Sequence, residues 1–337
     1  MDRMKLQKEK LKDFLDVLSK QKLFAPVKEG ETYSFAPVTA DTEISLEYTN
    51  TTKPPKDVLF PQTESLFYYQ YGDVNIDSKP EAEDRVVLGI RPCDAKAFNI
   101  VDNLFSWDED DTLYLEKREK ATLVGLSCLE PCVNCFCTSL NGGPASTEGL
   151  DVLMTDLGES FLLQPVTEKG DKLIQEAGDC LDNAEENDNK KAEELQQAAE
   201  QKISRKVEVE DIPEKLKELW ESEIWQDISD ACLGCGICTY LCPTCHCFDI
   251  QDEVEGFDGR RCRMWDSCMF EEYTLHASGH NPRSTRRERT RNRINHKYNY
   301  FVNRFGSIAC VGCGRCTSYC PVNIDILNIL NQVKEAL

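Results

Sequence analysis

The feature that most constrains this chain is a pair of cysteine motifs in its C-terminal third. Each motif has the spacing Cys-x2-Cys-x2-Cys-x3-Cys-Pro; the first begins at Cys232 and the second at Cys310. Three closely spaced thiolates wrap one corner of an iron–sulfur cubane, and the glycines between them allow a tight loop whose N–H groups face the sulfurs. Zinc sites use pairs of cysteines rather than four that end in proline. The repeat therefore predicts two [4Fe–4S] clusters.

The fourth cysteine of each motif is expected to cross over to the other cluster, as it does in two-cluster ferredoxins. Applied to this chain, that rule defines two ligand sets. The first cluster is expected to bind Cys232, Cys235, Cys238 and Cys320. The second is expected to bind Cys310, Cys313, Cys316 and Cys242.

The 18 cysteines of the 337-residue chain could serve as disulfides or as metal ligands. Disulfide frameworks belong mostly to short secreted chains, and the N-terminus MDRMKLQKEKLKDFL is charged and amphipathic, unlike a signal peptide. No stretch approaches the roughly 18 apolar residues of a membrane span. The net charge of −21 argues against nucleic acid as a ligand. We therefore expect a soluble cytoplasmic protein with metal thiolates.

An α/β domain with a partly parallel sheet is expected over residues 1–170. RVVLGI and ATLVGL are continuously apolar, which is typical of strands covered on both faces, and DVLF and SFLLQPV are further predicted strands. A helix is expected around AKAFNIVDNLF, and another where Leu11, Phe14 and Leu18 share a face. Residues 171–206 are expected to form an acidic helical linker or insertion, and residues 207–337 a mostly helical dicluster ferredoxin-like domain.

Two further helices are expected to lead into the motifs. IPEKLKELWESEIWQDISD precedes the first motif, and a helix that starts near Arg289 precedes the second. In the second helix, Ile294, Tyr298, Phe301 and Phe305 are spaced by four, three and four residues, which predicts one buried face.

A third group of cysteines lies in the predicted α/β domain. Its members are Cys93, Cys128, Cys132, Cys135 and Cys137. Cys93 and Cys128 each follow an apolar strand, and the carboxyl ends of neighbouring parallel strands form the crevice where α/β folds bind ligands. Five thiols for four positions predict a third [4Fe–4S] cluster. Buried structural thiols are the weaker explanation.

The spacing Cys128-x3-Cys132-x2-Cys135 also matches the radical S-adenosylmethionine motif, which would make the chain an enzyme. Three features count against that interpretation: the motif follows several strands, Cys137 comes immediately after it, and Asn134 stands where an aromatic residue is usual. Loss of the cluster on replacement of Cys132 would favour the radical-type trio.

Two features near the motifs remain open. Cys245, Cys247, Cys262 and Cys268 could bind another metal, although packing is the favoured explanation, and the histidines are given no role. The basic run from Arg283 to Lys297 could shield negative cubanes, dock an acidic partner or form a solvated helix face.

From about Arg91 to its end, the chain resembles the iron–sulfur β subunit of soluble NAD(P)-linked sulfhydrogenases and its relative, the corresponding iron–sulfur subunit of anaerobic sulfite reductase. The resemblance rests on RPCDAKAF, CFCTSLNGGP, CTYLCPTCHCFDI, WDSCMFEEYTLHASGHNPRSTRRERTRNRINHKY and CVGCGRCTSYCPVNIDI. It implies Cys93, Cys128, Cys135 and Cys137 as ligands of the third cluster, with Cys132 as the alternative.

The resemblance also implies a role. The chain would relay electrons between a flavin-bearing, NAD(P)-binding reductase subunit and a catalytic redox subunit of an anaerobic oxidoreductase complex, of the hydrogenase, sulfite reductase or transhydrogenase type. Ferredoxin is a further candidate partner. The alternatives are an enzyme that binds substrate at the N-terminal cluster and a free-standing ferredoxin-like carrier. The sequence has no GxGxxG after a strand, no phosphate-binding loop and no clear nucleophile–base pair.

Overall fold

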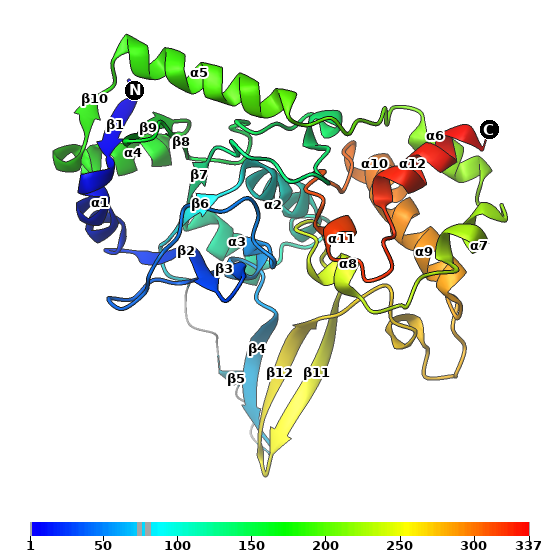
Figure 1. Ribbon diagram of the computed structural model, residues 1–337. Coiled ribbons are helices and arrows are strands. Elements are labelled where there is room, and N and C mark those ends of the chain that lie inside the picture. Colours follow the sequence, from blue (N-terminus) through cyan, green and yellow to red (C-terminus); the bar gives the residue numbers. More distant parts are fainter. Residues whose placement is uncertain (1, 73–75, 78–81, 337) are drawn as a thin grey trace.

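The computed structural model describes residues 2–72, 76–77 and 82–336. Among them, eight strands form a mixed sheet in the N-terminal half (Figure 1). In spatial order these strands are β10 (Asp182–Asn183), β1 (Met4–Gln7), β9 (Ser160–Pro165), β8 (Val152–Asp156), β7 (Ala121–Leu126), β6 (Arg85–Ile90), β2 (Lys22–Glu29) and β3 (Thr32–Pro37). The pairs β2–β6, β6–β7 and β7–β8 are parallel, and the flanking pairs are antiparallel. The expectation of a partly parallel sheet is therefore confirmed.

Helices cover both faces of the sheet, and each face has its own hydrophobic core. Val86 and Leu88 of β6 enter one core and Val87 between them enters the other, because successive side chains of a strand point to opposite faces. A register shift between Leu88 and Ile90 then places Ile90 in the same core as Val87. The first core is closed by α1 (Leu11–Leu18) and α4 (Glu168–Glu176). The second is closed by α2 (Pro92–Phe105) and α3 (Thr112–Glu119). Phe14 and Leu18 are buried in α1, as the spacing predicts.

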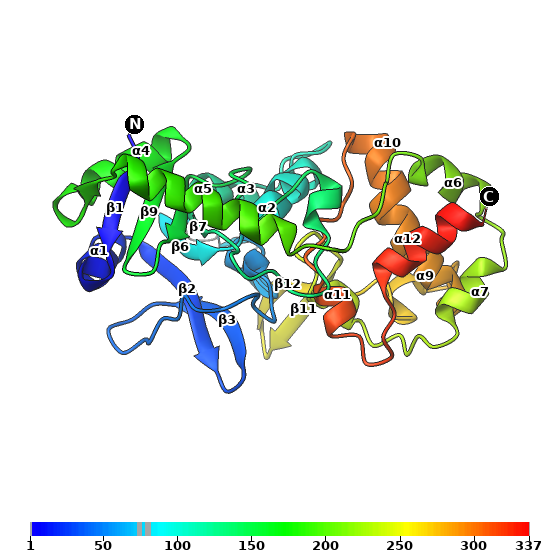
Figure 2. The same ribbon diagram turned by 45° about the horizontal axis from the view of Figure 1, so that its top comes forward.

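The segment expected to be a linker contributes to the N-terminal half. Its short strand β10 pairs with β1, and its main helix, α5 (Glu186–Gln201), runs along the outside of the sheet domain (Figure 2). Ala192 and Ala199 of α5 are fully buried. The capping box between Glu185 and Asp188 starts this helix, because it satisfies two N–H groups that have no partner within the helix.

The C-terminal half is mostly helical, as expected. Its helices are α6 (Ile212–Glu218), α7 (Ile224–Ser229), α8 (Ile237–Tyr240), α9 (Arg286–Asn295), α10 (Phe301–Phe305), α11 (Arg315–Ser318) and α12 (Ile326–Glu335). The helix expected from IPEKLKELWESEIWQDISD is two helices, α6 and α7. Between α9 and α10 lies the π-helical turn η6 (His296–Tyr300), a feature that is frequent at functional sites. Ile294, Tyr298 and Phe301 are buried, as their spacing predicts.

Shorter 3₁₀ turns join these elements, and one of them corrects a prediction. The turns are η1 (Lys8–Lys10), η2 (Pro55–Val58), η3 (Cys137–Leu140), η4 (Gly178–Cys180) and η5 (Glu272–Thr274). DVLF, expected to be a strand, begins inside η2. Pro54 and Pro55 fix φ near the helical value at the start of this turn, which favours the turn over an extended strand.

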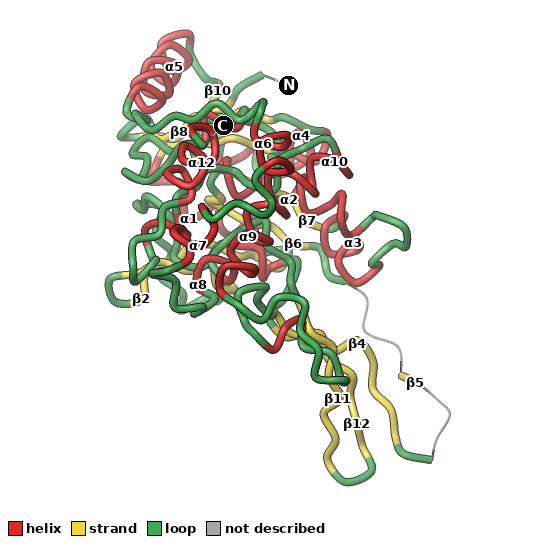
Figure 3. The backbone as a smooth tube through the Cα atoms, turned by 90° about the vertical axis from the view of Figure 1, so that its right-hand side faces the viewer, coloured by secondary structure: helices red, strands yellow, loops and turns green. Residues whose placement is uncertain are grey.

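A second sheet, absent from the sequence-based expectation, projects from the body as an arm (Figure 3). Its strands are β11 (Phe248–Glu255), β12 (Asp258–Trp265), β4 (Thr63–Gln70) and β5 (Ile76–Asp77). The hairpin β11–β12 interrupts the C-terminal region, and β12 pairs with β4 of the N-terminal region. The arm thus joins the two halves of the chain. None of the helices in the described residues has the length and apolar character needed to cross a bilayer.

A buried ion pair also joins the two halves. Arg315 of α11 donates from both terminal nitrogens to the carboxylate of Asp94 on α2, at 2.6 and 2.7 Å. The two side chains are only 1% and 2% exposed. Arg315 Nε also donates to the carbonyl oxygen of Thr51, at 2.8 Å. The carboxylate therefore compensates a guanidinium that has no access to water.

Replacing Asp94 by alanine is expected to destabilise the protein by about 3–5 kcal/mol, because it leaves a buried guanidinium unpaired. The midpoint of anaerobic urea unfolding measures the change, with iron content determined on the same samples. Glu186→Ala, which breaks an exposed pair with Lys190, serves as the control and should change stability by about 1 kcal/mol at most. Equal shifts for the two variants at equal iron content would contradict this account.

Candidate metal centres

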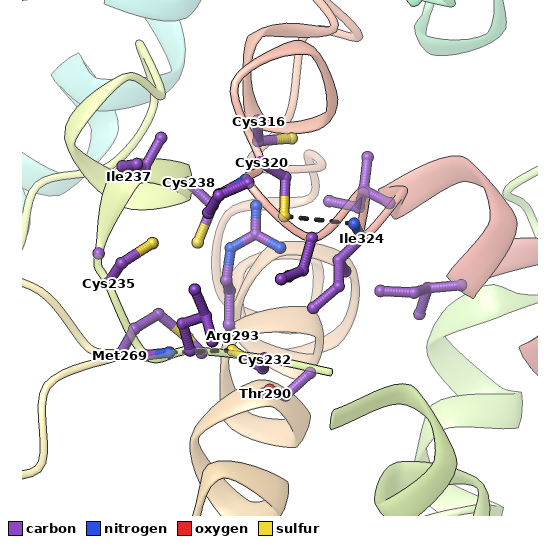
Figure 4. A pocket seen from close by; sticks show the side chains of 17 residues that line it. Cys232, Cys235, Ile237, Cys238, Met269, Thr290, Arg293, Cys316, Cys320 and Ile324 are labelled. Carbon is purple, nitrogen blue, oxygen red and sulfur yellow. Dashed lines mark hydrogen bonds between the residues drawn. The ribbon is translucent and has the colours of Figure 1, made fainter. Parts of the chain in front are cut away.

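The first expected ligand set lies around one cavity (Figure 4). The residues of this set are Cys232, Cys235, Cys238 and Cys320, and all four line the cavity. Three of them come from the loop before and within α8, and Cys320 comes from the loop after α11. The spacing rule therefore brings together side chains from two motifs that are far apart in the sequence. We refer to this cavity as site 1.

The second expected ligand set lies around a neighbouring cavity, site 2. Its lining includes all four members of the set, namely Cys242, Cys310, Cys313 and Cys316. Cys316 also borders site 1, so the two cavities adjoin. The crossed arrangement follows from the pairing of the two motif loops, in which α8 contacts α11.

Backbone N–H groups point at three of the cysteine sulfurs, as the glycine-containing loops predict. Gly234 N lies 3.4 Å from the Cys232 sulfur, and Gly312 N lies 3.5 Å from the Cys310 sulfur. Ile324 N donates to Cys320 at 3.2 Å (Figure 4). Such donors stabilise negative charge on sulfur and tune the potential of a bound cluster.

Two buried cations of the basic run also face the sites. Lys297 Nζ donates to the Cys242 sulfur at 3.3 Å and to the Ala309 carbonyl oxygen at 3.0 Å. Burial acts to lower the pKa of Lys297, but the neighbouring thiol groups, Cys242 first, outweigh it and raise the pKa. Arg293 is 5% exposed and borders both sites. The spacing of four between Arg289, Arg293 and Lys297 is the signal by which the sequence could have revealed this inward face.

The donors around site 1 fit an iron–sulfur cluster. Arg293 Nε and Nη2, and the Thr290 hydroxyl beside them, have no hydrogen-bond partner among the described residues. Leaving buried donors unpaired is costly, and the inorganic sulfides of a cubane would accept from them. Within the described part of the chain, no three His, Cys, Asp or Glu side chains converge to hold a single metal ion. A cubane does not require the four thiolates to converge on one point, because each thiolate binds a different iron of the cluster.

The third cysteine group lies where the sequence places it, beyond the carboxyl ends of β6 and β7. Cys93 stands in the first turn of α2, directly after β6, and Cys128 follows β7. A hydrogen bond from Cys135 lowers the pKa of Cys132 to about 5. Electrostatic interactions link Cys93 with Cys137, and Cys137 with Cys128. All five thiols thus gather at one edge of the sheet, and the choice of four ligands stays a prediction.

The loop of the second motif packs directly on this third group. Phe136 N donates to the carbonyl oxygen of Gly312 at 2.9 Å, and the Cys135 sulfur lies 3.6 Å from the carbonyl oxygen of Cys313. Gly312 has φ +64°, and a Cβ there would lie 2.7 Å from the backbone of the neighbouring loop. Glycine is therefore required here for both conformation and space.

The fold and these cavities define a class: iron–sulfur proteins that transfer electrons. Residues 231–324 match the family described as 4Fe-4S dicluster domain. Over 337 residues, the chain is 33% identical to Sulfhydrogenase 2 subunit beta of Pyrococcus furiosus, and the match covers 99% of each chain. The chain belongs to the family of sulfhydrogenase β subunits. The resemblance seen in the sequence is confirmed, and these matches support an iron–sulfur electron-transfer subunit.

Crossed ligation, in which the fourth cysteine of each motif binds the cluster of the other motif, predicts the iron content of cysteine variants. Cys232→Ala is expected to remove about four irons per chain, and adding Cys320→Ala should remove no more, because both residues border site 1. Adding Cys310→Ala to Cys232→Ala should remove about four further irons. Iron and acid-labile sulfide measured on anaerobically purified protein give the counts. A second large loss for the pair Cys232 and Cys320 would refute crossed ligation.

Lys297→Met is expected to lower the reduction potential of the cluster in site 2. Reduction adds negative charge, and the variant lacks the cation that bonds to the Cys242 sulfur. A charged hydrogen bond contributes roughly 1.5–3 kcal/mol, and about 1.4 kcal/mol corresponds to ~59 mV for a one-electron couple, so a decrease of about 60 mV is expected. Redox titration followed by EPR measures it. Lys172→Met, at an exposed position on α4, is the control and should leave the potential unchanged.

Proposed function

We propose that this chain is the electron-conducting subunit of a cytoplasmic, anaerobic oxidoreductase complex. It accepts electrons from, or delivers them to, a flavin- and NAD(P)-binding reductase subunit, and exchanges them with a catalytic redox subunit. Membership of the family does not by itself identify the reductase subunit or the catalytic subunit. Ferredoxin is a further candidate partner at either end.

The contiguity of the three cysteine groups carries this proposal. Cys316 borders both site 1 and site 2, and the loop around Cys313 packs on the third group. Electron transfer between clusters requires such closeness, whereas three independent structural metals would not. The two ends of the row also reach the surface: Leu233 beside site 1 is 62% exposed, and Val133, between Cys132 and Cys135 of the third group, is 85% exposed. These ends are where partner subunits would approach.

The bound clusters would supply one-electron chemistry, and the chain supplies position and potential. The thiolates hold the clusters at fixed places, while Arg293 and Lys297 place positive charge next to them. Burial of Cys232, Cys242 and Cys313, each at most 9% exposed, excludes water from the inner ligands. Cys235 is exposed, which leaves site 1 as the more open end of the row.

For the third cluster we propose Cys93, Cys128, Cys135 and Cys137 as ligands. Cys93 and Cys128 follow adjacent parallel strands, so the sheet itself fixes their separation. The backbone N–H of Cys135 donates a hydrogen bond to the carbonyl oxygen of Cys132 at 2.9 Å. The sulfur of Cys132 lies 3.6 Å from the Ser318 hydroxyl oxygen. The sulfur of Cys135 has a similar contact, 3.6 Å from the carbonyl oxygen of Cys313, so the choice of Cys135 over Cys132 rests on the family resemblance.

Replacing Cys128 by serine is expected to remove about four irons per chain and to block electron transfer between the two partners in the assembled complex. Cys132→Ser is the matched variant from the same loop, and it should retain the iron. Iron, sulfide and NAD(P)H-linked activity of the complex are measured together.

Three results would contradict parts of the proposal. Retention of iron in the Cys128 variant would remove the third cluster from the relay. Loss in the Cys132 variant would favour the radical-type trio. A monomer that exchanges electrons without any bound partner would favour a free-standing carrier.

A further inference from the structure

Three of the four cysteines left unassigned around the two motifs surround one buried cavity. Cys245, Cys247 and Cys268 line it, together with His246 and His296. We call this cavity site 4, with the third cysteine group counted as site 3. The remaining cysteine, Cys262, lies inside strand β12, opposite Gln251 and Ser65 of the adjacent strands. The structure therefore separates one packed cysteine from three that face a common space.

The β11–β12 hairpin explains how these cysteines meet. Cys247 stands just before β11, and Cys268 stands shortly after β12, 21 positions later in the sequence. The antiparallel register pairs Phe248 with Trp265, and Asp266 N donates to the carbonyl oxygen of Cys247 at 2.9 Å. The ends of the hairpin are thereby held together, and the two thiols are within hydrogen-bonding distance. The paired ends of the hairpin therefore bring Cys247 and Cys268 to the same cavity.

Site 4 resembles site 2 in charge. Lys297 lines both cavities, and Arg293 lines both of them and site 1 as well. Three thiols beside two buried cations suit a group of negative charge, because thiolates in a low-dielectric interior need nearby positive charge.

A histidine is placed to complete the ligand set. His246 Nδ1 lies 3.1 Å from the carbonyl oxygen of Thr244. A carbonyl oxygen can only accept, so Nδ1 carries the proton and Nε2 is the nitrogen left for a metal. A backbone carbonyl that orients the ring through its second nitrogen is the usual support of a metal-bound histidine.

We propose that Cys245, Cys247 and Cys268 bind a further [4Fe–4S] cluster, with Nε2 of His246 as its fourth ligand. The Cys245 thiol is hydrogen-bonded to Cys242, which belongs to site 2. The new cluster would therefore lie beside the middle of the row, as a branch. Its redox role rests on the proposed function, whereas its presence does not.

The test uses the full-length chain, loaded with clusters and purified without oxygen. Cys247→Ala combined with Cys268→Ala is expected to lower iron and acid-labile sulfide by about four each per chain, with no change in zinc. The matched control combines Cys262→Ala and Cys180→Ala, two cysteines buried elsewhere in the protein, and should lose none. Unchanged iron in the first variant, or a loss of zinc in place of iron, would overturn the proposal.

A second measurement covers the case in which the double variant does not fold. His246→Ala alone removes one ligand and keeps all thiols, and it is expected to change the Mössbauer spectrum of a single iron site in one cluster. An unchanged spectrum would overturn the assignment of His246. The Cys128 and Cys132 variants report on the third group only, so failure of site 4 and failure of the relay are distinguishable.

Discussion

Neutralisation of sulfur-centred negative charge in a buried region is the constraint on which the C-terminal half depends. Thiolates and reduced clusters are costly in an interior of low dielectric unless cations and N–H donors face them. The chain meets this demand with one helix: Arg293 of α9 and Lys297 of the following π-helical turn point between the motif loops. A protein with a net charge of −21 thus concentrates some of its cations where they face sulfur. The remaining arginines of α9 hold that helix in place; Arg286, for example, donates to the carbonyl oxygen of Cys232 at 2.6 Å.

The join between the two halves depends on close backbone contact. Gly312 and Gly314 both have positive φ, and a Cβ on either would lie 2.7 Å from the backbone of residues 134–137. The same glycines therefore shape the second motif and let it approach the third cysteine group. The Asp94–Arg315 pair and the β4–β12 pairing act on the same junction. Each of these contacts links residues far apart in sequence, so the position of the third group beside site 2 depends on the folds of both halves.

The sequence could predict those parts of the molecule that depend on residues close together in the chain. β6 and β7 were predictable because a run of apolar residues is stable only when covered on both faces, and sites 1 and 2 followed from a spacing rule. The β11–β12 hairpin was missed although Phe248, Ile250 and Val254 share one face of β11 and polar residues stand between them, which is a signal of a strand. Because β11 is exposed along most of its length, most of that face is not part of a core. The stability of the hairpin comes from pairing β12 with β4, nearly 200 residues away. The same hairpin brings Cys247 close to Cys268. Because the hairpin was not expected from the sequence, neither was site 4.

The basic run shows how three explanations separate once side-chain positions are known. A solvated helix face would expose its cations, but Arg289, Arg293 and Lys297 are at most 6% exposed. Docking of an acidic partner would also require exposed charge, and Arg287 and Arg291 instead contact Glu223 and Glu221 of the same chain. For Arg293, which lines sites 1 and 2, and Lys297, which lines site 2, shielding of buried sulfur is the explanation that fits the positions of the side chains; Arg286 of the same run is exposed. The π-helical turn further supports shielding as the role of Lys297. Lys297 lies in this turn and donates a hydrogen bond to the Cys242 sulfur. An irregular turn in an otherwise regular helix persists when a functional contact maintains it.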